Sequence, residues 1–464
     1  MKTKKKATIW HALIPIVFLM VALILTLQLW GGDPHLPILA AGVVAGGVAM
    51  LNLGYTWAEL EEGVVDTIKM AMGAILILMI IGMIIGTWIL AGIVPTMIFY
   101  GLKILTPSIF LVATCLICAV VSLATGSSWT TAGTVGIALV GVGAGLGMPL
   151  GLVAGAIISG AYFGDKMSPL SDTTNLAPAM AGSTLFDHIR HMIYTTGPAL
   201  VISLILYGFM GVKYAGKSLE SDSISVLLEG IQASFNINAL LLLAPVLVIA
   251  IVIMKVPAIP GLIGGTFLGG IFAWLFQGAG MTDIIGAAHY GFESATGIEA
   301  LDTLLSRGGL DGMMWTVSLI LIAMTFGGIL EKTGMLEAIA AELLKYAKST
   351  GSLVLATVLT IISMNLLAGD QYLAIVIPGR MFKEIYEDRG LAPKNLSRVL
   401  EDAGTLTSVL VPWNSCGLFM SSTLGVATVA YAPYAFLNIL NPIISVFYGF
   451  TGITMTKLEV DLAA

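Results

Sequence analysis

The sequence predicts an all-α polytopic membrane protein with about ten transmembrane spans, two re-entrant hairpins and two inverted-topology repeats that contain broken helices. Three observations support this class. Hydrophobic residues make up 57% of the 464-residue chain and charged residues only 10%, with a mean hydropathy of +0.97. Uncharged apolar runs long enough to cross a bilayer recur along the chain. Glycine, proline and hydroxyl residues interrupt these runs at related places.

Residues 1–66 predict a pair of N-terminal transmembrane helices after a short basic segment, Lys2–Lys6. The uncharged runs are Leu13–Trp30 and Leu36–Leu53. The positive-inside rule places the basic segment at the cytoplasmic surface. The sequence holds no other polybasic stretch, so we expect no nucleic-acid partner. The apolar runs predict the lipid bilayer as a partner.

An offset of 243 residues brings two parts of the chain into register. It aligns Gly126 with Gly369, and Pro169 with Pro412. Glycine and proline fix backbone geometry rather than hydrophobicity, so their alignment indicates an internal repeat. The domains we expect are N-terminal helices (1–66), a first inverted repeat (67–191), connecting helices (192–310), and a second inverted repeat with a final helix (311–464).

Each repeat predicts the same order of elements: a full span, an amphipathic piece, two apolar arms around a polar tip, and an interrupted helix. In the first repeat these are Thr67–Leu90, Val94–Leu105, Ile109–Ala124 before the tip Thr125–Ser128, and a break near Asp165–Asn175. In the second they are Gly312–Leu330, Leu336–Lys348, Leu353–Leu367 before the tip Ala368–Gln371, and a break near Thr405–Asn414. The polar connectors Tyr214–Asn238 and Thr282–Gly312 predict one amphipathic helix each.

Basic residues predict the orientation of the two repeats. Residues 332–398 contain eight Lys or Arg, whereas the matching residues 89–155 contain only Lys103. By the positive-inside rule the two stretches lie on opposite sides of the membrane, with both termini cytoplasmic. Inverted repeats with paired broken helices are typical of secondary transporters that work by alternating access. An ion channel and a membrane-embedded enzyme are the other classes we considered.

The first break carries the charges most expensive to place in a membrane. Asp165, Lys166 and Asp172 lie there among hydroxyl residues and prolines. An isolated Asp at a helix centre costs about 2.5–3.5 kcal/mol on insertion scales. A buried carboxylate can hold either a proton or Na⁺, which is the minimum chemistry of an antiporter. We therefore predict Na⁺ at Asp165 and Asp172. The alternative is that Asp165 pairs with Lys166.

Two further carboxylates, in the second repeat, are candidates for cation or proton binding. Asp402 follows Glu401 in the corresponding helix, where pairing with Arg398 is the alternative. Asp370 lies at the second hairpin tip as a proton carrier or as a partner of Arg380. Neutral oxygen ligands for substrate or ion are expected from Thr125, Ser127, Ser128, Thr173, Asn175, Asn414 and Ser415. These side chains could instead satisfy backbone groups that the breaks leave free.

Signatures of cofactor chemistry are missing from the sequence. It has no P-loop, no H-E-x-x-H, no G-x-S-x-G and no clustered Cys/His metal site. We therefore expect a transporter that is not an enzyme and has no cofactor, with Na⁺ and H⁺ as the transported ions.

Two motifs carry a family resemblance. The stretch SGAYFGDKMSPLSDTTNLAPAMAGS (Ser159–Ser183), followed by DHIRHMIYTTGP (Asp187–Pro198), closely resembles the NhaC-type Na⁺/H⁺ antiporters. LEDAGTLTSVLVPWNSCG (Leu400–Gly417) is similar to the family's second-half counterpart. The resemblance implies the ion-transporter superfamily architecture and Na⁺/H⁺ exchange across a bacterial inner membrane.

The same family includes sodium-coupled malate/lactate antiporters. The alternative function is therefore exchange of malate-H⁺ for Na⁺-lactate. A basic residue deep in the cavity would favour that alternative, and Lys166 is the near candidate. We leave a homodimer open.

Overall fold

The computed structural model describes residues 4–215 and 221–458. Regular structure in these residues is helical throughout, apart from two isolated backbone bridges. Eight helices are long and apolar enough to cross a membrane. They are α1 with its π-helical end η1 (Ile9–Ile24, Leu25–Leu29), α2 with η2 (His35–Val48, Ala49–Leu53), α3 (Trp57–Leu90), α5 (Pro107–Thr125), α10 (Leu185–Ala215), α13 (Ala258–Gln277), α16 with η5 (Met314–Lys332, Asp311–Met313) and α18 (Thr350–Leu367).

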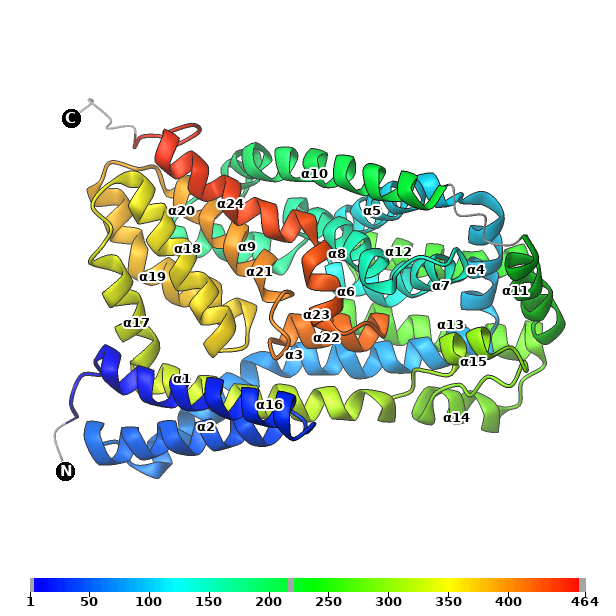
Figure 1. Ribbon diagram of the computed structural model, residues 1–464, viewed down its shortest axis with the longest axis horizontal. Coiled ribbons are helices and arrows are strands. Elements are labelled where there is room, and N and C mark those ends of the chain that lie inside the picture. Colours follow the sequence, from blue (N-terminus) through cyan, green and yellow to red (C-terminus); the bar gives the residue numbers. More distant parts are fainter. Residues whose placement is uncertain (1–3, 216–220, 459–464) are drawn as a thin grey trace.

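The remaining helices have at most 18 residues, and several form the second arms of hairpins or the pieces of broken helices. They are α4 (Ile93–Ile104), α6 (Ser128–Thr131), η3 (Ala132–Gly136), α7 (Ile137–Gly145), α8 (Leu150–Met167), α9 (Asp172–Ala181), α11 (Ser221–Ser234), η4 (Ala239–Leu242), α12 (Leu243–Ile253), α14 (Met281–Tyr290), α15 (Glu299–Leu305), α17 (Met335–Leu344), α19 (Gln371–Asp388), α20 (Pro393–Leu400), η6 (Glu401–Thr405), α21 (Leu406–Ser408), α22 (Ser415–Leu424), α23 (Thr428–Tyr431), η7 (Ala432–Tyr434) and α24 (Phe436–Thr451). Figure 1 shows most of the long helices running roughly along the longest axis of the molecule, with α10 at one edge and α1 and α2 at the other.

The number of spans agrees with the polytopic class that the sequence predicts. Two bent helix pairs raise the count among the described residues from eight to as many as ten. Two of the eight, α5 and α18, are the first arms of the expected hairpins, so these arms are already included in the count. The chain is a multi-pass helical membrane protein.

Corresponding elements begin 243 residues apart in the two halves. The helices α9 and α22 are both ten residues long and begin at Asp172 and Ser415. The second hairpin arm begins at Ser128 in α6 and at Gln371 in α19. Glycines with positive φ recur at the first tip and the second, where Gly126 has φ +71° and Gly369 has φ +67°. The opposed orientation of the two halves remains a prediction.

The connectors differ from the sequence expectation in one place. In the described part of residues 214–238, α11 is the single helix that follows the end of α10, as expected. Residues 282–312 contain most of α14 and all of α15, where one helix was expected. Gly291, with φ +92°, ends α14 in a conformation that L-residues rarely adopt, and an irregular segment separates the two helices.

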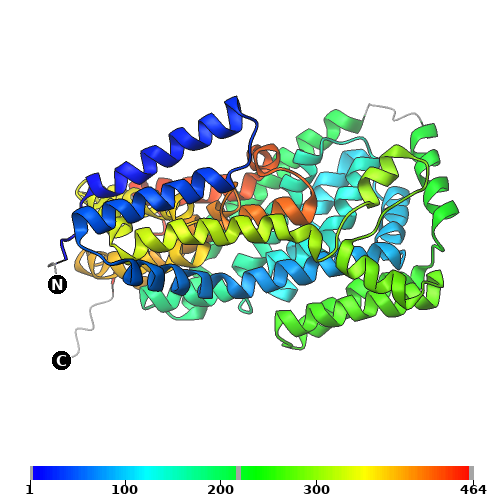
Figure 2. The ribbon, with the colours of Figure 1, turned by 90° about the horizontal axis from the view of Figure 1, so that it is seen from below.

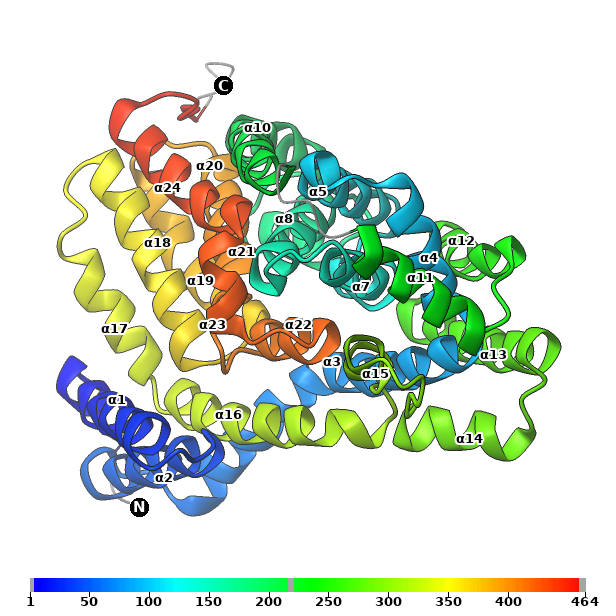
Figure 3. The same ribbon diagram turned by 45° about the vertical axis from the view of Figure 1, so that its right-hand side comes forward.

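Peripheral helices enclose the two halves on one side. The N-terminal helices α1 and α2 pack against α16 and α17 at the edge of the molecule (Figure 2). On the inner side, α22 lies against α3 and α16 (Figure 3). The second broken helix therefore faces the long helix α3 across the middle of the protein.

Close packing of small residues fixes the first hairpin against the first broken helix. A Cβ atom added at Gly160 of α8 would lie 2.0 Å from the carbonyl oxygen of Cys115 in α5. One at Gly164 would lie 2.3 Å from the backbone nitrogen of Leu123. Glycine is therefore required for the two helices to approach this closely. This contact brings the tip after α5 beside the end of α8, where Asp165 lies.

Candidate functional site

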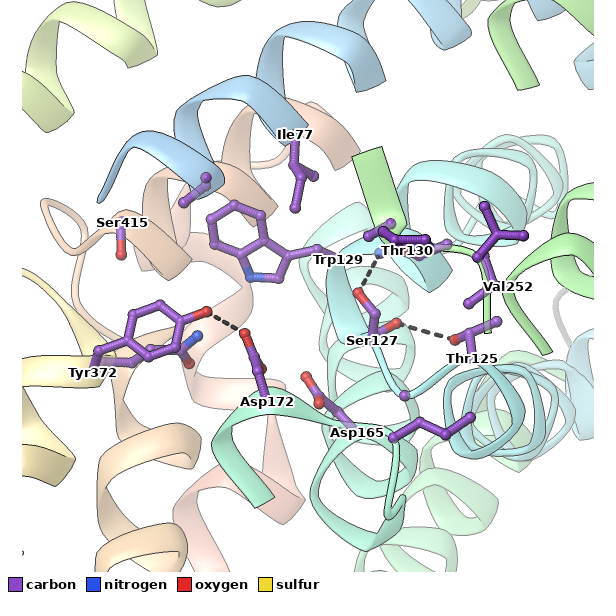
Figure 4. Close-up of a pocket in the computed structure, with 18 of the residues that line it drawn as sticks. Ile77, Thr125, Ser127, Trp129, Thr130, Asp165, Asp172, Val252, Tyr372 and Ser415 are labelled. Atoms are coloured by element: carbon purple, nitrogen blue, oxygen red, sulfur yellow. Dashed lines mark hydrogen bonds between the residues drawn. The ribbon is translucent and has the colours of Figure 1, made fainter. Parts of the chain in front are cut away.

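A cavity of about 540 Å³ lies where the breaks of the two halves meet. One face of α3, from Met70 to Ile77, forms one wall. The first hairpin tip, the break after α8 and the turn between α12 and α13 form the others, together with Gln371, Tyr372 and Ser415 from the second half. Figure 4 shows Asp165 and Asp172 both facing this space. Non-helical backbone at membrane depth is tolerated where it lines such a cavity.

Asp165 is held by the first hairpin tip. It lies in the last turn of α8 and is buried, with 8% of its surface exposed. Its Oδ2 atom accepts hydrogen bonds from the backbone N–H of Ser128 at 3.0 Å and from the Ser128 hydroxyl at 2.6 Å. Its Oδ1 atom has no hydrogen-bond partner among the described residues. Asp165 lines the cavity and thus combines an anchored oxygen with a buried, unpartnered one.

Asp172 is held from the opposite half. It is the first residue of α9, after the capping residue Ser171. Its Oδ1 atom accepts from the backbone N–H of Thr173 at 2.8 Å, and its Oδ2 atom accepts from the hydroxyl of Tyr372. Tyr372 lies in the first turn of α19, so this hydrogen bond joins the two halves across the cavity (Figure 4). The break after Met167 places the two carboxylates on separate helices that face one space.

The other expected oxygen ligands of the first half fall into two groups. Thr125 and Ser127 line the cavity, and the Ser127 hydroxyl caps α6 by accepting from the N–H of Thr130 at 3.1 Å. Thr173 and Asn175 do not line it. The Asn175 amide donates to the carbonyl oxygens of Pro169 and Ser171, so it satisfies backbone groups of the break, which was the alternative for these side chains.

Asp370 and Asn414 act as helix caps in the second half. Asp370 accepts from the N–H groups of Tyr372 at 2.8 Å and Leu373 at 3.3 Å, and from the Ser415 hydroxyl at 3.2 Å. Asn414 accepts from the N–H of Cys416 at 3.0 Å. Both are buried and neither lines the cavity, whereas Ser415 does. Among the described residues Asp370 forms no ion pair, so the structure does not show the pairing with Arg380 that was one of its two alternatives.

Asp402 lies in a separate buried cluster of charges. Its carboxylate pairs with Lys166 and lies 3.8 Å from the Nε atom of Arg398, and all three side chains are fully buried. The hydroxyl of Thr195 donates to it at 2.9 Å. The structure thus brings Lys166 to Asp402 rather than to Asp165, and it does not bring Asp402 to the cavity. The pairing of Arg398 with Asp402, which was the alternative to cation binding, is present as this 3.8 Å contact.

Sequence reasoning missed three residues of the cavity wall. Tyr372 bonds to Asp172, and Lys255 lies at the exposed turn after α12. The indole of Trp129 stacks on the ring of Phe419 in α22, with ring centroids 3.9 Å apart. Trp129 and Tyr372 each come directly after a hairpin tip. An aromatic residue next to each tip was the signal that could have found them.

Comparisons with known proteins agree on one family. A family model described as the Na⁺/H⁺ antiporter family matches residues 160–453. The chain is 40% identical over 455 residues to the Na⁺/H⁺ antiporter NhaC of Alkalihalophilus pseudofirmus, with 98% of each chain covered. It is 41% identical to the malate-2H⁺/Na⁺-lactate antiporter of Bacillus subtilis, covering 97% of this chain and 96% of that one. It is also 41% identical to the arginine/ornithine antiporter ArcD of Halobacterium salinarum, covering 97% and 93%.

Proposed function

The chain belongs to the Na⁺/H⁺ antiporter family, and from this premise we propose that it exchanges Na⁺ for H⁺ across the membrane as a secondary transporter. The observation that carries the proposal is the buried, unpartnered Oδ1 atom of Asp165, a residue that lines the same cavity as Asp172. An unpaired buried carboxylate is costly unless it holds a proton or meets a cation.

The cavity offers the donor set that Na⁺ requires. Na⁺ is a small cation that transporters bind through carboxylate, hydroxyl and carbonyl oxygens. Asp165 and Asp172 supply the charge, and the hydroxyls of Thr125, Ser127 and Ser415 line the same space. Ser128 supports the site indirectly, because it holds one oxygen of Asp165 and leaves the other free.

Competition at these carboxylates couples the two ions. A proton on Asp165 removes the charge that attracts Na⁺, and bound Na⁺ favours the ionised form. One site can therefore carry either ion but not both at once. If the protein moves this site between the two sides of the membrane, each Na⁺ carried one way is replaced by protons carried the other way.

Two contacts between the halves suit a movement of this kind. The Tyr372–Asp172 hydrogen bond joins α19 to α9, and the Trp129–Phe419 stack joins the first hairpin tip to α22. We place residues 67–191 and 311–464 as inverted repeats in a bacterial inner membrane, with both termini cytoplasmic, because the basic residues predict that orientation. Alternating access would then break and remake these two contacts.

Exchange of an organic acid is the second candidate. Lys166, the basic residue first considered for a substrate carboxylate, is engaged by Asp402 away from the cavity. Lys255, however, lines the cavity and is exposed at its turn. A cavity of about 540 Å³ also exceeds what a single Na⁺ needs. These two observations keep a carboxylate substrate as a candidate beside Na⁺.

Proteoliposomes with an internal pH dye test both candidates. An outward or inward Na⁺ gradient is imposed, with malate, lactate or neither inside the vesicles. A dye response with Na⁺ alone supports Na⁺/H⁺ exchange, and a response that requires the organic acid supports the second candidate. No response under any of these conditions would refute both.

A further inference from the structure

A fully buried carboxyl group, Glu401, lies outside the lining of the cavity and contacts Thr174 of α9. It is the first residue of the π-helical turn η6, which continues α20. Single π-helical turns occur frequently at functional sites. Within the described residues Glu401 forms no ion pair, although its neighbour Asp402 forms one with Lys166. Its oxygens meet only hydroxyls: Thr405 contacts Oε2, and Thr174 contacts Oε1 at 3.4 Å.

Counting hydrogens shows which form of Glu401 these contacts fit. The hydroxyl of Thr174 lies 3.0 Å from the carbonyl oxygen of Lys166 and 3.2 Å from that of Asp165. A hydroxyl has one hydrogen to donate and two lone pairs to accept with. If that hydrogen goes to either nearby carbonyl oxygen, Thr174 can bond to Glu401 only by accepting. A hydrogen bond at this 3.4 Å contact then requires a proton on Oε1 of Glu401, while Oε2 accepts from Thr405.

The surrounding charges also suit the ionised form. The helices α8, α9, α10, α19, α20 and α24 pack against η6. The charged and titratable groups that face η6 from these helices and from η6 itself are Arg398, Asp402, Asp165, Lys166, Asp172, His188, His191, Tyr386 and Tyr448. The two cations Lys166 and Arg398 face only one paired anion, Asp402. Protonated Glu401 leaves this cluster with one positive charge, and ionised Glu401 neutralises it. Both states therefore have a physical basis.

Thr174 connects Glu401 to the residue that we place at the Na⁺ site. When Glu401 ionises, the Thr174 hydrogen can turn toward it, and the carbonyl oxygens of Asp165 and Lys166 lose their donor. Both changes make the end of α8 more negative, which favours Na⁺ at Asp165. By linkage, Na⁺ at Asp165 favours loss of the proton from Glu401 to the same extent.

We propose that Glu401 is a second proton-binding residue of the exchange, coupled to Asp165 through the hydroxyl of Thr174. This inference rests on the proposed Na⁺/H⁺ exchange. It extends the proton-binding groups from the cavity wall to a carboxyl buried outside the cavity lining. Each Na⁺ that binds would then displace protons from two groups, Asp165 and Glu401.

Counting the protons that Na⁺ displaces tests the proposal. The full-length protein is placed in weakly buffered detergent solution, Na⁺ is added in steps, and a pH dye records the protons released for each Na⁺ bound. As the pH rises by one unit, we expect the apparent dissociation constant of the wild type for Na⁺ to fall by up to about 100-fold, because each linked proton contributes about tenfold. In Glu401→Gln we expect this constant to fall by about tenfold per unit, and we expect one proton fewer to be released per Na⁺.

A pair of variants at Thr174 guards against misfolding of the Glu401 variant. Thr174→Val removes the hydroxyl and should lower the proton count as Glu401→Gln does, while Thr174→Ser keeps the hydroxyl and should restore it. Glu331→Gln is the matched control, because Glu331 is a half-buried carboxyl that bonds to Thr67 in α3. It should leave the count unchanged.

The outcomes separate the two proposals. If the wild type releases no protons on Na⁺ binding, the proposed exchange fails. If the wild type releases protons and both Glu401→Gln and Thr174→Val release as many, the exchange stands and the assignment of Glu401 is overturned.

Discussion

Replacing Lys166 with methionine should destabilise the protein, because it leaves the Asp402 carboxylate without its ammonium partner. Both side chains are fully buried. Removing one partner of a buried ion pair usually costs about 3–5 kcal/mol. Asp402 would keep the Thr195 hydroxyl at 2.9 Å and the Arg398 Nε atom at 3.8 Å. We therefore expect a loss at the low end of that range, about 3 kcal/mol of unfolding free energy.

A double-mutant cycle measures this coupling. Unfolding in sodium dodecyl sulfate, followed by tryptophan fluorescence, gives the free energies for Lys166→Met, Asp402→Leu and the double variant. The loss of unfolding free energy in the double variant should be smaller than the sum of the losses in the two single variants, because the double variant leaves neither Lys166 nor Asp402 as an unpaired buried charge. Lys348→Met, at an exposed lysine, should change the value by no more than about 0.5 kcal/mol. Strict additivity of the two single losses would refute the pairing.

Three further predictions concern the cavity, the packing and the connecting helix α15. Tyr372→Phe removes the hydrogen bond from the Tyr372 hydroxyl to Asp172, which Na⁺ must otherwise displace when it binds this carboxylate. The KM for Na⁺ in proteoliposomes should therefore fall by about tenfold, and an unchanged or higher KM would contradict this prediction. Gly160→Ala places a Cβ atom 2.0 Å from a carbonyl oxygen and should cost about 1–3 kcal/mol on detergent unfolding, whereas Gly47→Ala, with nothing within 4 Å, should stabilise by up to about 1 kcal/mol. Donation from the N–H and hydroxyl of Thr296 lowers the pKa of Asp302 below 3.8, so Asp302→Asn should lower the unfolding temperature at pH 7, and this difference should vanish as the pH falls through the folded pKa.

Local signals in the sequence were enough to predict the breaks in the helices. Gly126 and Gly369 both have positive φ at the hairpin tips, as residues without a Cβ atom allow. The prolines and hydroxyls near Pro169 predicted the gap between α8 and α9. These features depend on a few neighbouring residues, so one sequence is sufficient to find them.

Long-range pairings could not be predicted in the same way. Lys166 meets Asp402 across 236 residues, and Tyr372 meets Asp172 across 200. No periodicity specifies which buried charge will take which partner, because that depends on how the two halves pack. The pattern placed Asp402 among the cation ligands, whereas the structure gives it to an internal ion pair. Ser171 and Asn414, which lie 243 residues apart, both cap helices in the structure, although neither had been predicted as a cap from the sequence.

The most direct test of the cation site is Na⁺-driven proton movement in proteoliposomes that contain Asp165→Asn or Asp172→Asn. Asparagine keeps the shape of each side chain and removes the charge that we assign to Na⁺ binding. Glu331→Gln serves as the control for loss of a carboxylate elsewhere. We expect both aspartate variants to reach the membrane at wild-type levels and to show no exchange. Exchange at the wild-type rate in both would contradict the assignment of this cavity as the transport site.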